Sequence, residues 1–156
     1  HQADAQLARG ETKKKVGWGR VRPLPLLRFL VHAGRRGGLS PSPVREVSTF
    51  AGRVSLDLPG APEIVPLPGH TPGSVAVWFP SLGALMVGDA LTTGHVLTGA
   101  KGPRPAPFTM EPAAALASLE HIADLPARWL LPGHGSPWQG SVRDAVEQVR
   151  RATTDK

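Results

Sequence analysis

Residues 66–74 read PLPGHTPGS and place a histidine in a turn between two apolar runs. The first run, residues 63–68, is strand-like and stops at a Pro-Gly pair, and His70 follows directly. Thr-Pro-Gly then turns the chain, and the second run covers residues 74–79. Glycine at the end of a strand permits a sharp turn and the close approach of another group. The pattern indicates an imidazole held rigidly in a turn, with partners elsewhere in the chain.

Two later positions repeat this arrangement of strand, glycine and metal-binding side chain. Asp89 follows the run 84–87 and Gly88, and His134 follows the run 127–131 between two glycines. If these strands share a sheet, their ends converge at one edge. Two imidazoles and a carboxylate there suit a divalent metal such as Zn²⁺. Taken singly, each residue has an ordinary alternative as a polar loop or turn residue, but the repetition favours a metal site.

The remaining histidines are weaker candidates. His95 lies in the loop after Asp89 and could face a substrate, although ordinary loop polarity explains it equally well. His121 lies beside the apolar stripe of a predicted helix, and His32 lies in a variable segment. Ser74 lacks the Gly-x-Ser-x-Gly context of a serine hydrolase, and no Gly-rich phosphate loop is present. Serine-nucleophile and nucleotide-binding functions are therefore not predicted.

The order of elements, strands, helix, strand and helix, favours a mixed α/β (α+β) fold, and residues 1–156 suit one domain or part of a larger one. Residues 13–43 are basic and rich in Gly and Pro, and we interpret them as a variable insertion that contains one amphipathic helix. Short strands joined by tight turns predict an antiparallel meander in the middle of the chain. The expected elements are a short helix in 1–12, a helix over 23–32, strands over 53–59, 63–68, 74–79, 84–87 and 127–131, a loop over 91–108, and helices over 109–125 and 141–152.

Composition limits the classes of partner. Hydrophobic residues make up 40% of the 156 residues, which suits a folded core. The net charge of +6 comes from 18 Lys and Arg against 12 Asp and Glu, and many of the basic residues cluster in the first part of the sequence. A solvated basic face explains this cluster better than nucleic acid, since no aromatic residues interleave with the charges. The sequence has no cysteine and no apolar run long enough to span a membrane. We expect a cytoplasmic protein with a small-molecule substrate; the oligomeric state is left open.

Three motifs in this order, LPGHTPGSVAVWFP, LMVGDAL and LLPGHGSPW, resemble the metallo-β-lactamase superfamily, which includes hydroxyacylglutathione hydrolases and lactonases. The resemblance covers about residues 44–150. It implies an αβ/βα sandwich with one or two zinc ions. His70 would be the third ligand of the first metal, Asp89 would bridge both metals, and His134 would bind the second. A metal-activated water would then attack an ester, thioester, lactone or similar bond.

The family's first signature, His-x-His-x-Asp-His, is absent from this sequence. We therefore expect the chain to begin after that motif and to represent the C-terminal part of the fold. On this interpretation we expect it to bind metal weakly and to show little or no hydrolysis by itself. Two alternatives stay open: a non-catalytic remnant or binding protein of the same fold, and, less favoured, a basic module that binds nucleic acid.

Overall fold

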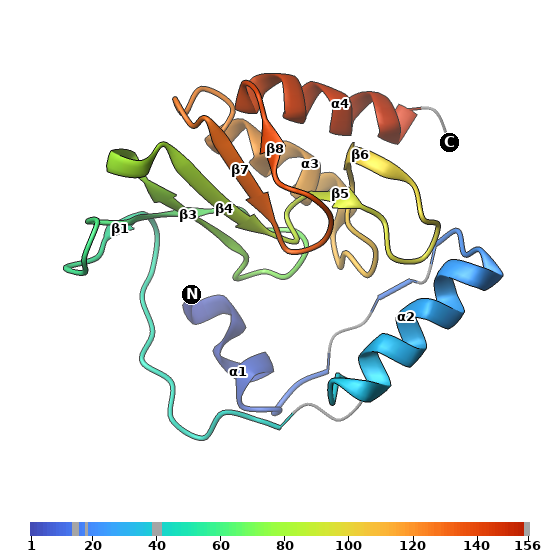
Figure 1. Cartoon of the computed structure of the whole chain (residues 1–156). Coiled ribbons are helices and arrows are strands. Elements are labelled where there is room, and N and C mark those ends of the chain that lie inside the picture. The colour runs from blue at the N-terminus through green and yellow to red at the C-terminus, as the bar shows by residue number, and fades with distance from the viewer. Residues whose placement is uncertain (14–15, 18, 39–41, 155–156) are drawn as a thin grey trace.

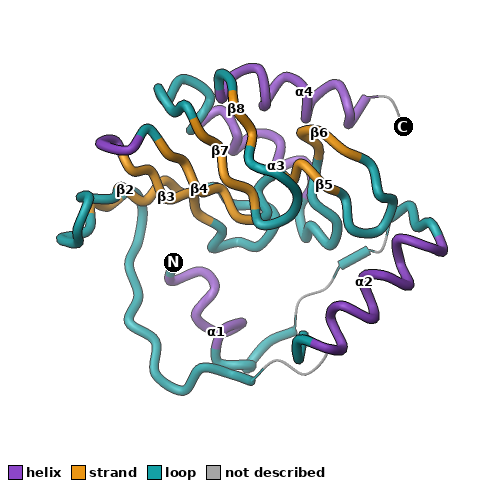
Figure 2. The backbone as a smooth tube through the Cα atoms, in the orientation of Figure 1, coloured by secondary structure: helices purple, strands orange, loops and turns teal. Residues whose placement is uncertain are grey.

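The computed structural model describes residues 1–13, 16–17, 19–38 and 42–154 as helices and strands joined by long connections (Figure 1, Figure 2). In chain order the elements are η1 (Gln2–Asp4), α1 (Ala5–Ala8), α2 (Pro23–Arg35), β1 (Val54–Ser55), β2 (Glu63–Pro66), β3 (Val75–Phe79), η2 (Pro80–Leu82), β4 (Ala84–Gly88), β5 (Thr92–Gly94), β6 (Lys101–Arg104), α3 (Pro112–Ser118), η3 (Leu119–His121), β7 (Trp129–Pro132), β8 (Trp138–Gln139) and α4 (Val142–Thr154).

Six of the strands form one mixed sheet in the order β1-β2-β3-β4-β7-β8. Strands β1 to β4 pair antiparallel in sequence order, which confirms the predicted meander. β7 then joins β4 in parallel, after a crossover that contains β5, β6 and α3. Because two successive antiparallel pairings restore the original direction, β2 and β4 run the same way, and the parallel pairing gives β7 that direction too. Figure 1 shows the arrows of β4 and β7 pointing the same way.

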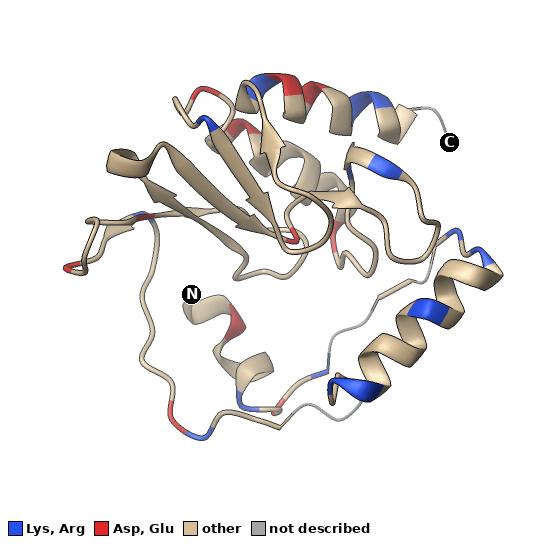
Figure 3. Ribbon diagram, in the orientation of Figure 1, with Lys and Arg blue, Asp and Glu red and all other residues tan. Residues whose placement is uncertain are grey.

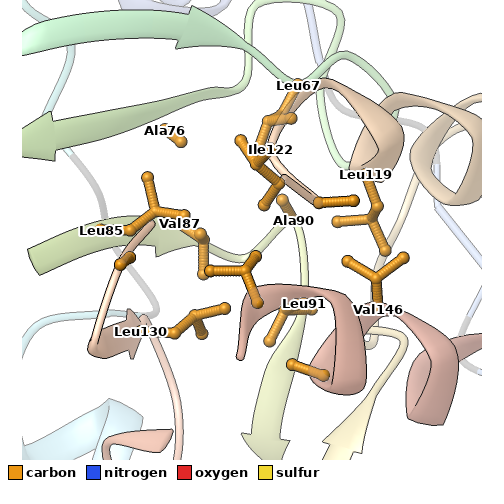
Figure 4. Packing of buried hydrophobic residues seen from close by; sticks show 14 of the residues in the cluster. Leu67, Ala76, Leu85, Val87, Ala90, Leu91, Leu119, Ile122, Leu130 and Val146 are labelled. Atoms are coloured by element: carbon orange, nitrogen blue, oxygen red, sulfur yellow. The ribbon is translucent and has the colours of Figure 1, made fainter. Parts of the chain in front are cut away.

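The hydrophobic core lies between one face of this sheet and the helices α3, η3 and α4. Successive residues of a strand point to opposite faces, and on β4 Leu85 and Val87 are buried whereas Met86 is 46% exposed. In α4 the buried residues recur at helical spacing, at Val142, Ala145, Val146 and Val149. Figure 4 shows side chains of the sheet and of these helices meeting in one cluster. The helical segments after β6 and after β8 thus pack on the same face of the sheet.

The opposite face of the sheet is less covered. Met86 on β4 points there, and Trp129 on neighbouring β7 is 40% exposed. A sheet covered by helices on one face corresponds to one αβ half of the expected αβ/βα sandwich. The described residues hold this large sheet and the separate two-stranded sheet of β5 and β6.

Several predicted boundaries were wrong. The segment 91–108 is not a plain loop, because β5 and β6 pair antiparallel within it and β6 contacts α4. The predicted strand over 53–59 is only the two residues of β1, and β8 was missed. Of the helix predicted over 109–125, only α3 is α-helical, and the short 3-10 helix η3 follows it. Short strands such as β8 are stabilised by tertiary pairing, which local sequence does not reveal.

The N-terminal segment carries α1 and α2. The expected short helix ends near Gly10, whose φ of +72° suits glycine. The helix expected over 23–32 is α2, which begins at Pro23 and continues to Arg35. Within the described ranges, every helix is too short or too polar to cross a bilayer.

Gly69 allows α3 to approach the turn after β2. Its φ is +138°, and a Cβ added there would lie 2.2 Å from the backbone nitrogen of Ala115 on α3. We expect Gly69→Ala to lower the free energy of unfolding by about 3 kcal/mol, because it combines backbone strain with a clash against backbone. Urea denaturation measures this.

Gly52→Ala is the matched control, because Gly52 also has a positive φ, of +63°, but nothing lies within 4 Å of an added Cβ. Its expected cost is only about 1 kcal/mol, from the left-handed backbone conformation. Equal losses in the two variants would contradict a tight contact between the turn and α3.

Candidate metal centre

The three residues predicted as metal ligands follow the three strands that share one direction. His70 lies in the turn after β2, Asp89 directly follows β4, and His134 lies two residues beyond β7. Because the carboxyl ends of β2, β4 and β7 reach the same edge of the sheet, the three side chains gather there. The convergence expected from the sequence is therefore observed.

Asp89 lies between the two histidines. Its Oδ2 is 3.7 Å from His70 Nε2 and 3.6 Å from His134 Nε2. These separations are too long for hydrogen bonds. Zinc binds nitrogen and oxygen ligands at about 2.0–2.2 Å, so two ligands of one tetrahedral ion lie about 3.4 Å apart. The distance from Asp89 Oδ2 to each Nε2 atom is thus close to the distance between two ligands of the same ion.

Thr109 fixes the protonation of the His70 ring. Its hydroxyl donates to the carbonyl of Ala106 at 2.9 Å, and its Oγ1 is 3.2 Å from His70 Nδ1. A hydroxyl has one proton, so Nδ1 must donate to Oγ1. The neutral ring then carries its proton on Nδ1 and directs the lone pair of Nε2 toward Asp89. Hydrogen bonds of this kind orient metal-binding histidines and set their tautomer.

The other oxygen of Asp89 is buried. Oδ1 has no hydrogen-bond partner among the described residues, and it packs so close to Gly133 that a Cβ there would lie 2.5 Å away. A buried carboxylate oxygen without a donor is costly, and a cation at this edge would offset the cost. The donor set, two imidazoles and a carboxylate, therefore fits a divalent metal in chemistry.

The described residues do not supply a complete set of metal ligands. Across the described ranges, no three His, Asp or Glu side chains are grouped closely enough to hold an ion by themselves. The arrangement is two His–Asp pairs that share one carboxylate, rather than one closed three-ligand site. This chain thus presents one histidine on each side of Asp89.

Backbone contacts position His134. The amide of Gly133 donates to the carbonyl of Gly88 at 2.7 Å, which joins the turn before His134 to the turn before Asp89. The amides of Thr93 and Gly94 on β5 both donate to the carbonyl of His134, at 3.1 and 3.3 Å. Thr93 has no role in the sequence prediction, because its contribution depends on a contact across the fold.

Asp4 holds the turn that carries His70. Its Oδ1 accepts from the amide of Gly73 at 2.8 Å, and its Oδ2 accepts from the hydroxyl of Thr71 at 2.5 Å. Within the turn, the amide of Thr71 donates to Ser74 Oγ at 2.9 Å. Nothing in the local sequence around Asp4 signals this role, since its partners lie almost seventy residues away.

The other histidines take different places. His95 lies outside the His–Asp pairs and lines a cavity beside them, so its contact with a substrate stays a prediction. His121 is an exposed residue of η3, and its Nδ1 lies 2.8 Å from the carbonyl oxygen of Pro66.

The tautomer of His70 can be tested directly. In metal-free protein at mildly alkaline pH, we expect imidazole nitrogen chemical shifts that place the proton on Nδ1. Thr109→Val removes the acceptor, so the Nδ1-protonated form should lose its dominance, whereas Thr109→Ser should keep it. A proton on Nε2 in the unsubstituted protein would contradict the role given to Thr109.

Comparison with solved structures finds several proteins similar to this chain. A metallo-beta-lactamase family protein from Thermus thermophilus is 20% identical with a TM-score of 0.60, and the match covers 99% of this chain and 52% of that one. The protein TTHA1623, solved in a di-iron-bound form, is 31% identical over 76% of this chain and 58% of its own, with a TM-score of 0.48. The metallo-beta-lactamase FIM-1 from Pseudomonas aeruginosa, in a mono-zinc form, is 19% identical over 80% of this chain and 52% of its own, with a TM-score of 0.49.

The chain spans about half the length of these proteins. No protein of curated function matches the sequence. The model of the metallo-beta-lactamase superfamily matches residues 4–134, which include all three candidate ligands. The family and fold expected from the three motifs are confirmed, while the lactonase-like subgroup stays a prediction. The chain belongs to the metallo-beta-lactamase superfamily.

Proposed function

We propose that this chain is the C-terminal portion of a zinc-dependent hydrolase that cleaves an ester, thioester, lactone or similar bond. The observation that carries the proposal is the position of Asp89 Oδ2, within 3.7 Å of one imidazole nitrogen and 3.6 Å of another. His70 and His134 would each bind metal through Nε2, and Asp89 would serve both sides. The remaining ligands would come from residues that the 156-residue sequence does not contain.

The residues of this chain would bind and orient. A bound zinc ion would supply Lewis acidity and lower the pKa of a bound water molecule to about 7. Thr109 keeps the proton of His70 on Nδ1, which leaves Nε2 as the donor atom. The side chain of His70 is only 12% exposed, whereas that of His134 is 44% exposed. The His134 side of the site is therefore the more open to solvent.

Metal binding by substituted chains tests the ligand assignment. The expected affinity of the unsubstituted chain for zinc is weak, because each side of Asp89 has one histidine. Asp89→Asn should weaken binding by at least about 100-fold, since even the outer partners of metal ligands contribute about 10–100-fold. His70→Ala and His134→Ala should each remove one candidate ligand and so weaken zinc binding. Calorimetric titration with zinc and metal analysis of the dialysed protein measure these effects.

His32→Ala is the matched control, because His32 is an exposed histidine on α2. It should leave zinc binding unchanged. If all four variants bind zinc as the unsubstituted chain does, the ligand assignment is wrong.

The hydrolase assignment has its own test. With zinc added, the chain should hydrolyse generic esters, thioesters and lactones only slowly, and the coding sequence upstream of His1 should contain His-x-His-x-Asp-His. A start codon immediately before His1 would instead favour a non-catalytic protein of this fold, an alternative that agrees with the incomplete ligand set.

A further inference from the structure

A large cavity opens beside the candidate metal centre. Its volume is about 1120 Å³, which is ample for a small organic molecule. Ala90 in its wall directly follows Asp89, and Thr109 in its wall holds the ring of His70. The cavity therefore adjoins both a candidate metal ligand and the partner of another.

The wall of this cavity has an apolar part and a basic part. The helices α3 and α4 contribute Leu116 and Val149, and Phe108 adds an aromatic ring. Three arginines, Arg20, Arg22 and Arg104, also line the cavity. None of the described lining residues is Asp or Glu.

Arg22 and Arg104 lie in segments that hydrogen bonds hold in place. The backbone amide of Arg22 donates to the carbonyl of Leu97 at 2.9 Å, which fastens the chain before α2 to the loop after β5. On β6, Arg104 Nε donates to the carbonyl of Gly102 at 2.9 Å, and Nη2 donates to the carbonyl of Lys101. A guanidinium has five N–H donors, so Arg104 keeps donors for a ligand. Figure 3 shows basic positions on β6 and just before α2.

No carboxylate of the described residues neutralises these charges. The ion pairs that described arginines form with acids involve Arg9, Arg143, Arg150 and Arg151. Arg20, Arg22 and Arg104 take part in none of them. Guanidinium groups bind carboxylate and phosphate oxygens strongly, so an anionic group would find unneutralised positive charge beside an apolar wall.

We propose that this cavity binds a small molecule with a carboxylate or phosphate group at the arginines and an apolar portion against α3 and α4. The assignment of this molecule as the substrate rests on the proposed function, whereas its binding does not require a metal. The inference also gives a role to part of the basic segment 13–43. A concave, partly apolar site suits a small ligand better than a nucleic acid strand, which needs exposed aromatic platforms.

Binding to metal-free protein tests the proposal. The probes are octanoate, octyl phosphate, the neutral methyl octanoate, inorganic phosphate and a short single-stranded oligonucleotide, each titrated into the chain in the presence of a chelator. We expect octanoate and octyl phosphate to bind at least about tenfold more tightly than the neutral ester and inorganic phosphate. The preference between the two anions identifies the group that the arginines accept.

Two double variants locate the binding site. Arg20→Gln with Arg22→Gln should raise the Kd of the preferred anion about tenfold or more. Arg45→Gln with Arg53→Gln removes the same net charge from exposed positions outside the cavity wall and should change the Kd less than about twofold. Ala152→Trp, at the α4 wall, should weaken octanoate and octyl phosphate by filling apolar space.

Three results would overturn the proposal: equal affinity for the neutral ester and the anions, equal losses in the two double variants, or tighter binding of the oligonucleotide than of either amphiphile. These results are distinguishable from a failure of the metal assignment. A chain that binds the anions but not zinc supports the cavity proposal and contradicts the metal-ligand assignment. A chain that binds zinc but not the anions supports the metal-ligand assignment and contradicts the cavity proposal.

Discussion

The common direction of β2, β4 and β7 is the constraint on which the candidate site depends. It follows from two antiparallel pairings and one parallel pairing within a single sheet, and it brings three separate turns to one edge. The hydrogen bond from the amide of Gly133 to the carbonyl of Gly88 extends the parallel pairing into the turns themselves. The positions of Asp89 and His134 are therefore set by backbone geometry, and the buried face of the sheet, packed on α3 and α4, keeps that geometry rigid.

Features encoded by neighbouring residues were predictable. Alternation in the strands, helical spacing in α4 and the repeated strand–glycine pattern predicted the main elements and the convergence of His70, Asp89 and His134, whose role as metal ligands stays a prediction. Features that depend on distant partners were not. The helix expected from residue 109 begins only after Glu111, and the hydroxyl of Thr109 contacts His70 instead. β6 has the sequence Lys-Gly-Pro-Arg, which no strand propensity favours, and it exists because β5 and α4 lie beside it.

The place of the arginines in the fold differs from what composition indicates. By composition, the basic segment 13–43 looked like a solvated face, and all five of its arginines are exposed, Arg20 and Arg22 included. The structure nevertheless places Arg20 and Arg22 in the wall of a cavity that also contains Arg104 from β6. Residues 84 positions apart in sequence thus contribute to one electropositive surface. Composition gives the amount of charge, whereas only the fold shows which charges gather and what they face.

The hydrogen bonds of Asp4 have a consequence for the order of folding. They join positions 67 and 69 residues apart, and closing a loop of that length costs on the order of 4 kcal/mol in chain entropy. The meander β2 to β4 closes much shorter loops and can form first. We therefore expect the turn that carries His70 to gain its contacts with Asp4 only when the N-terminal helix docks. Completion of the candidate site would then follow formation of the sheet that supports it.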